Sequence, residues 1–248
     1  LLTAVGELCQ VAGWVASDAG NRRDAARYYL AGVKAAHAAD DRALGANLLS
    51  SLAYQETNQN GGRSALLLAA SAATGAPKAA PTARALFQER VAWAAANTGD
   101  HHTAGRALAE VERLYDQRRA DVEPEWTYWL NPDEIDVMAA RCFVALKRPE
   151  AAIPKLSDVL SHYDPSLTRE RALYLSWLAE ACIQTGDLDH AVTVATECLE
   201  LSDSTNSSRT TDRVQHLRQL LQQHASVACV RDFLDRTMSG PRQNETRT

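Results

Sequence analysis

Small residues recur at two fixed positions in five successive stretches of this sequence. Each stretch has a turn residue, with an alanine five positions after it and another small residue seven positions before it. The turn residues are Gly20, Asn60, Gly99, Lys147 and Gly186; the later column is Ala25, Ala65, Ala104, Ala152 and Ala191; the earlier column is Gly13, Ala53, Ala92, Ala140 and Ala179. Because small side chains at fixed positions let helices approach closely, each stretch is predicted to form a helix, a tight turn and a second helix. Stacked helix pairs of this kind predict an all-α fold, an α-solenoid.

The composition agrees with an all-α fold and narrows the classes of function. A hydrophobic fraction of 46% supplies a core, while only 12 Gly and 8 Pro argue against an all-β protein. The net charge of −5 speaks against nucleic-acid binding by bulk electrostatics. The segment from Arg209 to Thr248 is mildly basic, and we interpret it as a solvated face.

The cellular location is predicted from cysteine usage and from apolar runs. The five cysteines show no CxxC spacing, and most lie on apolar helical stretches, which favours a reduced, cytoplasmic protein. No apolar run reaches the length of a membrane span and no signal peptide is visible, so we expect no membrane contact. The sequence begins at Leu1 inside a helical pattern, which suggests that an amino-terminal part is absent.

The spacing of the turns defines the predicted domain organisation. The turn residues are separated by 40, 39, 48 and 39 positions, and GNRRDAARYY, GDHHTAGRAL, KRPEAAIPKL and GDLDHAVTVA each give turn, spacer, alanine and helix. These repeats resemble tetratricopeptide repeats, whose usual period is about 34 residues. We expect about five repeats over residues 1–203, with an inserted loop near 117–133, where Pro124 and Pro132 break helix. Residues 204–239 are expected to form two capping helices after a Ser/Thr-rich linker, and 240–248 a disordered tail.

The first helix of each pair is expected to line an inner groove. Positions two, six and nine or ten before each turn share one side of that helix and carry aromatic, amide, hydroxyl and charged side chains. Such a surface suits recognition of an extended peptide or a small molecule. The alternative is that Trp14 and Trp93 only fill space between successive helices. The predicted ligand-binding groove consists of Gln10, Trp14, Asp18, Ser50, Tyr54, Asn58, Glu89, Arg90, Trp93, Asn97, Met138, Arg141, Trp177 and Glu180.

No catalytic or cofactor motif emerges from the sequence. His101 and His102 are adjacent at a turn without a third ligand in helical spacing, so a solvated loop is favoured over a metal site. Neither a GxSxG nucleophile turn nor a glycine-rich phosphate loop is present. We therefore expect a protein that is not an enzyme and that uses no cofactor.

Several segments together resemble one family. VAGWVASDAGNRRDAARYYLAGVKAAHAADDRALGANLLSSLAYQ, PEWTYWLNPDEID and DRVQHLRQLLQQHASVACVRDFLDR are similar to parts of actinomycete transcriptional regulators. Those regulators carry an Xre-type helix-turn-helix domain followed by a tetratricopeptide-like region. The resemblance implies that this chain senses a signal, mediates dimers, or both, and that DNA is bound only by a domain absent here. It supplies no ligand-binding residue.

Three hypotheses follow from the sequence. The leading one is a ligand-sensing or protein-interaction module of a cytoplasmic transcriptional regulator, and the second is a stand-alone adaptor that binds partner proteins. An enzyme is the third and least favoured. A homodimer is also conceivable, in which the apolar end helix ACVRDFLDRTM pairs with a copy of itself.

Overall fold

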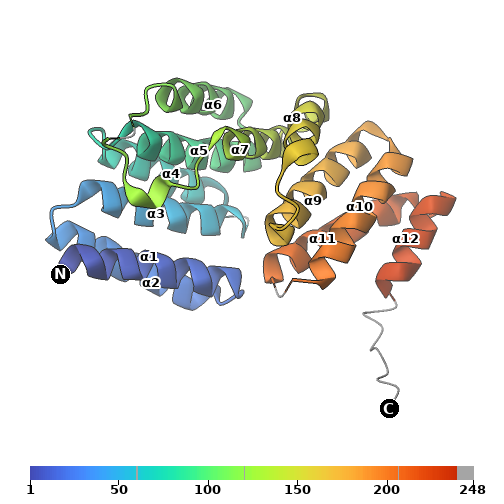
Figure 1. The fold of residues 1–248 in the computed structure, drawn as a ribbon, viewed down its shortest axis with the longest axis horizontal. Helices are drawn as coiled ribbons and strands as arrows, with labels where there is room; N and C mark the ends of the chain where they lie inside the picture. The colour runs from blue at the N-terminus through green and yellow to red at the C-terminus, as the bar shows by residue number, and fades with distance from the viewer. Residues whose placement is uncertain (60, 120, 206, 239–248) are drawn as a thin grey trace, which may run out of the picture. The chain divides into compact units, whose positions relative to one another are not determined.

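The computed structural model describes the whole chain except residues 60, 120, 206 and 239–248, so the predicted turn at Asn60 and the predicted tail at 240–248 lie outside the described residues. The described residues form helices and no strands (Figure 1). The helices are α1 (Leu2–Asp18), α2 (Arg22–Ala38), α3 (Arg42–Thr57), α4 (Gly62–Gly75), α5 (Pro81–Asn97), α6 (His101–Tyr115), the 3-10 helix η1 (Glu125–Thr127), α7 (Pro132–Ala145), α8 (Pro149–His162), α9 (Thr168–Thr185), α10 (Leu188–Asp203), α11 (Ser208–Leu221), the 3-10 helix η2 (Gln222–His224) and α12 (Ala228–Met238). The predicted all-α fold is confirmed.

The chain divides into two compact units, Leu1–Leu146 and Lys147–Thr248. In the first unit α1 packs on α2, α3 on α4 and α5 on α6, while α1, α3, α5 and α7 also pack on one another in that order. In the second unit α9 packs on both α8 and α10, and α11 and α12 pack on the α9–α10 pair. Four of the predicted pairs thus form within the units, α1–α2, α3–α4 and α5–α6 in the first and α9–α10 in the second, while the boundary between the units falls between α7 and α8.

Both columns of small residues lie at helix contacts. All nine alanines of the two columns have no exposed surface, and Gly13 is buried as well. A Cβ added at Gly13 would lie 2.5 Å from Cε1 of Tyr29, so the α1 backbone approaches the α2 tyrosine too closely for any side chain. The columns therefore set how near the paired helices come.

The described turn residues of the repeated pattern adopt the same backbone conformation. Gly20, Gly99 and Gly186 have φ of 80°, 75° and 81°, and Lys147 adopts the same left-handed region with φ of 58°. The residue after each glycine donates its N–H to a carbonyl five positions earlier, which closes the first helix. The same residue then caps the second helix: the side chains of Asn21, Asp100 and Asp187 accept from backbone N–H groups three positions later.

Lys147→Gly is expected to raise the free energy of unfolding by roughly 0.5–1 kcal/mol, because a residue with a Cβ is strained at positive φ. Gly99→Ala should instead lower the free energy of unfolding by about 1 kcal/mol. A Cβ at this position would meet nothing within 4 Å, so only backbone strain opposes the substitution. Urea unfolding followed by circular dichroism measures both. A Lys147→Gly variant less stable than the parent contradicts this prediction.

The segment between α6 and α7 contains no α-helix among its described residues and is anchored by its aromatic residues. The Trp126 ring stacks on Phe87 of α5 with centroids 6.4 Å apart, and Trp129 Nε1 donates to the Trp126 carbonyl at 3.0 Å. The Glu123 carboxylate accepts from the backbone N–H of Thr82 at 3.0 Å and so caps α5. The segment stabilises the start of a helix about forty residues earlier.

Two further observations concern the linker before α11 and the possibility of a membrane-spanning helix. α11 begins at Ser208, so the Ser/Thr-rich linker is shorter than the sequence suggests; Ser202 and Thr210 hydroxyls, both buried, form a 3.0 Å hydrogen bond across it. Within the described residues, no helix combines enough length and apolar character to cross a lipid bilayer.

Candidate functional site

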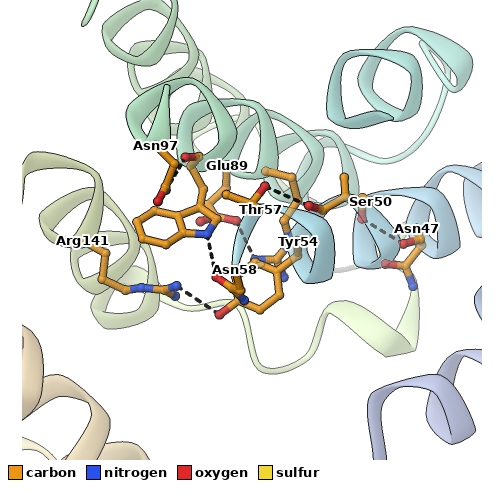
Figure 2. Close-up of polar contacts among 11 residues, drawn as sticks. Asn47, Ser50, Tyr54, Thr57, Asn58, Glu89, Asn97 and Arg141 are labelled. Atoms are coloured by element: carbon orange, nitrogen blue, oxygen red, sulfur yellow. Dashed lines mark hydrogen bonds and ion pairs between the residues drawn. The ribbon is translucent and has the colours of Figure 1, made fainter. Parts of the chain in front are cut away.

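One position of the repeat brings side chains of four helices together. The residues six before successive turns, Trp14 on α1, Tyr54 on α3, Trp93 on α5 and Arg141 on α7, meet on the side where these helices pack on one another. Arg90 of α5 joins them. We call these five residues the Tyr54 cluster; Figure 2 shows its polar contacts.

The Tyr54 ring is the centre of the cluster. The Trp14 ring stacks on it with centroids 6.3 Å apart and planes inclined by 23°. The guanidinium carbons of Arg90 and Arg141 lie 4.3 Å and 5.5 Å from the Tyr54 centroid, distances that allow cation–π attraction. Arg141 Nη2 also donates to the Tyr54 hydroxyl at 3.0 Å (Figure 2). Tyr54 therefore contacts side chains from α1, α5 and α7.

The Trp93 indole joins the cluster to exposed amides. The Arg141 guanidinium carbon lies 4.5 Å from the Trp93 ring centroid. Trp93 Nε1 donates to Asn58 Oδ1 at 3.0 Å, and Asn97 Nδ2 donates to the Trp93 carbonyl at 2.8 Å (Figure 2). Both asparagines are exposed, so the edge of the cluster presents amide groups to solvent.

Charged groups of both signs are buried here. Glu89 has only 2% of its surface exposed, and its carboxylate accepts from Arg90 Nη1 at 2.8 Å. Burial lowers the pKa of Arg141, but the Tyr54 hydroxyl and the Glu89 carboxylate outweigh burial and raise it above its usual value. Arg141 is therefore a permanent cation. Two guanidinium groups face one carboxylate among these three residues.

The predicted groove residues of the first unit differ in depth. Gln10, Trp14, Asp18 and Arg141 are half-buried, Asn58 and Asn97 are exposed, and Ser50, Tyr54, Glu89, Arg90, Trp93 and Met138 are buried. Two of the buried residues have other roles. Ser50 Oγ donates to the Asn47 carbonyl within α3, and Met138 packs in a hydrophobic cluster with Leu86 and Leu114.

Trp177 and Glu180 belong to the second unit, where α11 contacts them. Arg213 of α11 places its guanidinium carbon 3.5 Å from the Trp177 ring centroid, and its Nη2 donates to Glu180 Oε2 at 2.7 Å. Arg213 Nε also donates to the buried Ser176 hydroxyl, and His216 Nε2 lies 3.3 Å from Glu180 Oε2. The Glu180 carboxylate is thus engaged within the chain. Arg213, which the sequence placed on a solvated face, is mostly buried, because it pairs with this carboxylate.

Stability should depend on pH through Glu180. Burial raises the pKa of Glu180, but hydrogen bonding from His216 and the charge of Arg213 lower it from 4.5 to about 2. A depressed carboxylate pKa stabilises the fold above pH 4.5, and this stabilisation of roughly 3 kcal/mol is lost as pH falls toward 2. Urea unfolding of the parent and of Glu180→Gln at several pH values checks this. The difference between the two should shrink over that window; a constant difference would contradict it.

Candidate metal ligands and nucleophiles among the described side chains are not arranged for metal binding or nucleophilic attack. No group of three His, Cys, Asp or Glu that could hold a metal ion occurs in the described part of the chain, and His101 and His102 are exposed. A catalytic Cys–His–Asp relay needs the thiol at one ring nitrogen of the histidine and the carboxylate at the other. Here Cys182 Sγ lies 3.6 Å from His190 Nδ1, and Asp187 Oδ2 lies 3.9 Å from the same nitrogen. Burial also raises the pKa of Cys182 to about 11, which opposes thiolate formation.

Comparison with known proteins yields no assignment. No protein-family model matches this chain, and a search of curated proteins finds no significant match.

Proposed function

We propose that this chain is the ligand-sensing part of a cytoplasmic transcriptional regulator and that its helix pairs are about five tetratricopeptide-like repeats of an α-solenoid. The ligand is a peptide or small molecule that binds against the Tyr54 cluster. DNA is contacted by a domain outside this chain. Recognition, and not catalysis, is its role.

The observation that carries the proposal is the burial of charge in the Tyr54 cluster. Replacing a buried ion pair by apolar residues of similar volume is often neutral or stabilising, so stability alone does not account for the buried pair of Glu89 and Arg90 beside Tyr54. A cluster of aromatic rings and guanidinium groups is a common means of recognising another molecule. Four helices contribute side chains to the cluster, so a ligand bound there can affect the packing of all four.

The exposed parts of the cluster indicate what it recognises. Trp14 is half-buried and can stack on a ring or an apolar group. The amides of Asn58 and Asn97 can pair with the backbone of an extended peptide, and the guanidinium of Arg141 favours a carboxylate. Binding that alters the packing of α1, α3, α5 and α7 shifts the population of arrangements these helices adopt, which is how a signal leaves the site.

Trp14→Ala is expected to weaken ligand binding by about tenfold or more, because a truncated tryptophan at the centre of a contact costs about 2 kcal/mol. The ligand is first found by equilibrium dialysis of the parent against a library of short peptides and metabolites, with mass-spectrometric detection. Its affinity for each variant is then measured by intrinsic tryptophan fluorescence or calorimetry. Asn58→Ala should weaken binding as well.

Tyr128→Ala is the matched control, since Tyr128 is an exposed aromatic residue outside the cluster. Its affinity should equal that of the parent. Equal affinities for the parent, Trp14→Ala and Asn58→Ala would contradict the proposed site, and a library that yields no ligand would favour an adaptor for whole proteins.

A further inference from the structure

Two exposed asparagines of the first unit are tied to the same buried tryptophan. Asn58 and Asn97 stand two positions before consecutive predicted turns, and both side chains are exposed. Trp93, which is 4% exposed, donates from Nε1 to Asn58 Oδ1 at 3.0 Å and accepts at its carbonyl from Asn97 Nδ2 at 2.8 Å (Figure 2). A buried residue of α5 thus holds two solvent-exposed amides in place.

The two amides are held in opposite orientations. An indole N–H can only donate, so the oxygen of the Asn58 amide faces Trp93 and the nitrogen is left for another partner. A backbone carbonyl can only accept, so the nitrogen of the Asn97 amide faces Trp93 and the oxygen is left. Among the residues that the structure describes, neither Asn58 Nδ2 nor Asn97 Oδ1 has a hydrogen-bond partner. The pair therefore presents one donor and one acceptor.

One donor beside one acceptor matches the main chain of a peptide. Each residue of a peptide other than proline has a carbonyl that accepts and an N–H that donates. An ionised carboxylate, by contrast, only accepts and would leave the oxygen of Asn97 without a donor. Because Trp93 holds both amides in place before a ligand arrives, binding orders few additional side-chain torsions. Hydrogen bonds to the main chain give affinity for a peptide of any sequence.

We propose that Asn58 and Asn97 bind the main chain of an extended peptide, with Asn58 Nδ2 donating to a peptide carbonyl and Asn97 Oδ1 accepting from a peptide N–H. The proposal rests on the proposed function and narrows its ligand from a peptide or small molecule to a peptide. Selectivity among peptides then comes from other parts of the Tyr54 cluster, such as the half-buried Trp14.

A peptide without distinctive side chains tests this proposal. The probe is pentaalanine with an acetylated amino end and an amidated carboxyl end, so it carries no charge. In proton–nitrogen correlation spectra of the ¹⁵N-labelled protein, the side-chain NH2 signal of Asn58 should shift saturably, with a dissociation constant on the order of 1 mM. The same peptide with every amide nitrogen fully methylated has no N–H to donate and should bind at least about tenfold more weakly. In Asn97→Ala the two peptides should bind alike.

Asn58→Asp removes the donor and keeps the contact with Trp93, because a carboxylate oxygen still accepts from Nε1. Its affinity for the neutral probe, followed through the Trp93 indole signal, should fall at least about tenfold. Asn131→Asp is the matched control. It makes the same change of charge at an exposed residue whose Oδ1 caps α7 through the Glu134 N–H, and it should bind the probe as the parent does.

Three results would each overturn the proposal: no saturable shift of the Asn58 signal at about 10 mM probe, equal binding of the methylated peptide to the parent, or parent-like affinity of Asn58→Asp. The proposed function fails separately. A library ligand that contains no peptide group but requires Trp14 for binding would leave the proposed function intact and overturn the narrower claim that the ligand is a peptide.

Discussion

Arg213→Ala is expected to lower the free energy of unfolding by about 3 kcal/mol, because it removes the guanidinium that pairs with a buried carboxylate. Glu180 is 6% exposed and accepts a 2.7 Å hydrogen bond from Arg213, which also bonds the Ser176 hydroxyl. Without Arg213, His216 is left to oppose the effect of burial, so the pKa of Glu180 rises relative to the parent, and the group then binds a proton or stays charged at a cost. Denaturant unfolding followed by far-UV circular dichroism measures the loss.

Arg236→Ala provides the matched control. Arg236 and Glu200 form a 3.2 Å ion pair in the same unit, with both side chains more than half exposed, so its loss should cost less than about 1 kcal/mol. Adding Glu180→Gln to Arg213→Ala removes the orphaned charge and should recover part of the stability. If Arg213→Ala costs no more than Arg236→Ala, the buried network does not hold α11 on α9.

Gly13→Ala should destabilise the first unit by about 2 kcal/mol, although alanine is the better helix former. The new Cβ would lie 2.5, 2.7 and 2.9 Å from three atoms of the Tyr29 ring. Tyr29 is fully buried, so we expect the new Cβ to force α1 and α2 apart. Thermal unfolding monitored by circular dichroism gives the change.

Gly105→Ala on α6 should move stability in the opposite direction. Its Cβ meets nothing within 4 Å, so the substitution should add roughly 0.5–1 kcal/mol through helix propensity alone. The contrast between the two glycines isolates close packing from propensity. A Gly13→Ala variant as stable as Gly105→Ala would show that the α1–α2 contact tolerates wider spacing.

The helix pairs and their turns were predictable because they depend on local requirements. A residue at positive φ follows α1, α5, α7 and α9, and Gly20, Gly99, Lys147 and Gly186 occur at the predicted places. The alanines pack without exposed surface because a larger side chain would separate the helices. A positive φ at the turn and a small side chain at the helix contact each restrict the residue type at a fixed position, so both can be found in the sequence.

The depth of the cluster residues was not predictable from the repeat. Trp14, Tyr54 and Trp93 occupy the same position relative to their turns, yet Trp14 is half-buried and the other two are buried. The reason is that α3 and α5 have a packed neighbour on either side, whereas α1 is the first in the row. The position of a residue relative to its turn predicts which side of the helix it lies on. It does not predict how many other helices cover that side.

The network of Arg213 escaped sequence analysis because its partners are distant in sequence. Glu180 lies 33 positions earlier, and the intervening Ser/Thr-rich stretch and basic residues suggest a solvated end. One signal was present: Arg213 and His216 share a helix face, three residues apart, beside a helix whose inner side carries Glu180. A carboxylate on a packed side requires a cation from the next helix.

The hydrogen bond between Arg141 and Tyr54 joins residues 87 positions apart, whereas most helix contacts in this chain join sequence neighbours. Neighbouring helices close small loops and associate early in folding, while a contact of such separation forms only after the intervening helices have docked. Interactions that form after the transition state govern the rate of unfolding and leave the rate of folding nearly unchanged. We therefore expect loss of the contact between Arg141 and Tyr54 to raise the rate of unfolding more than it lowers the rate of folding.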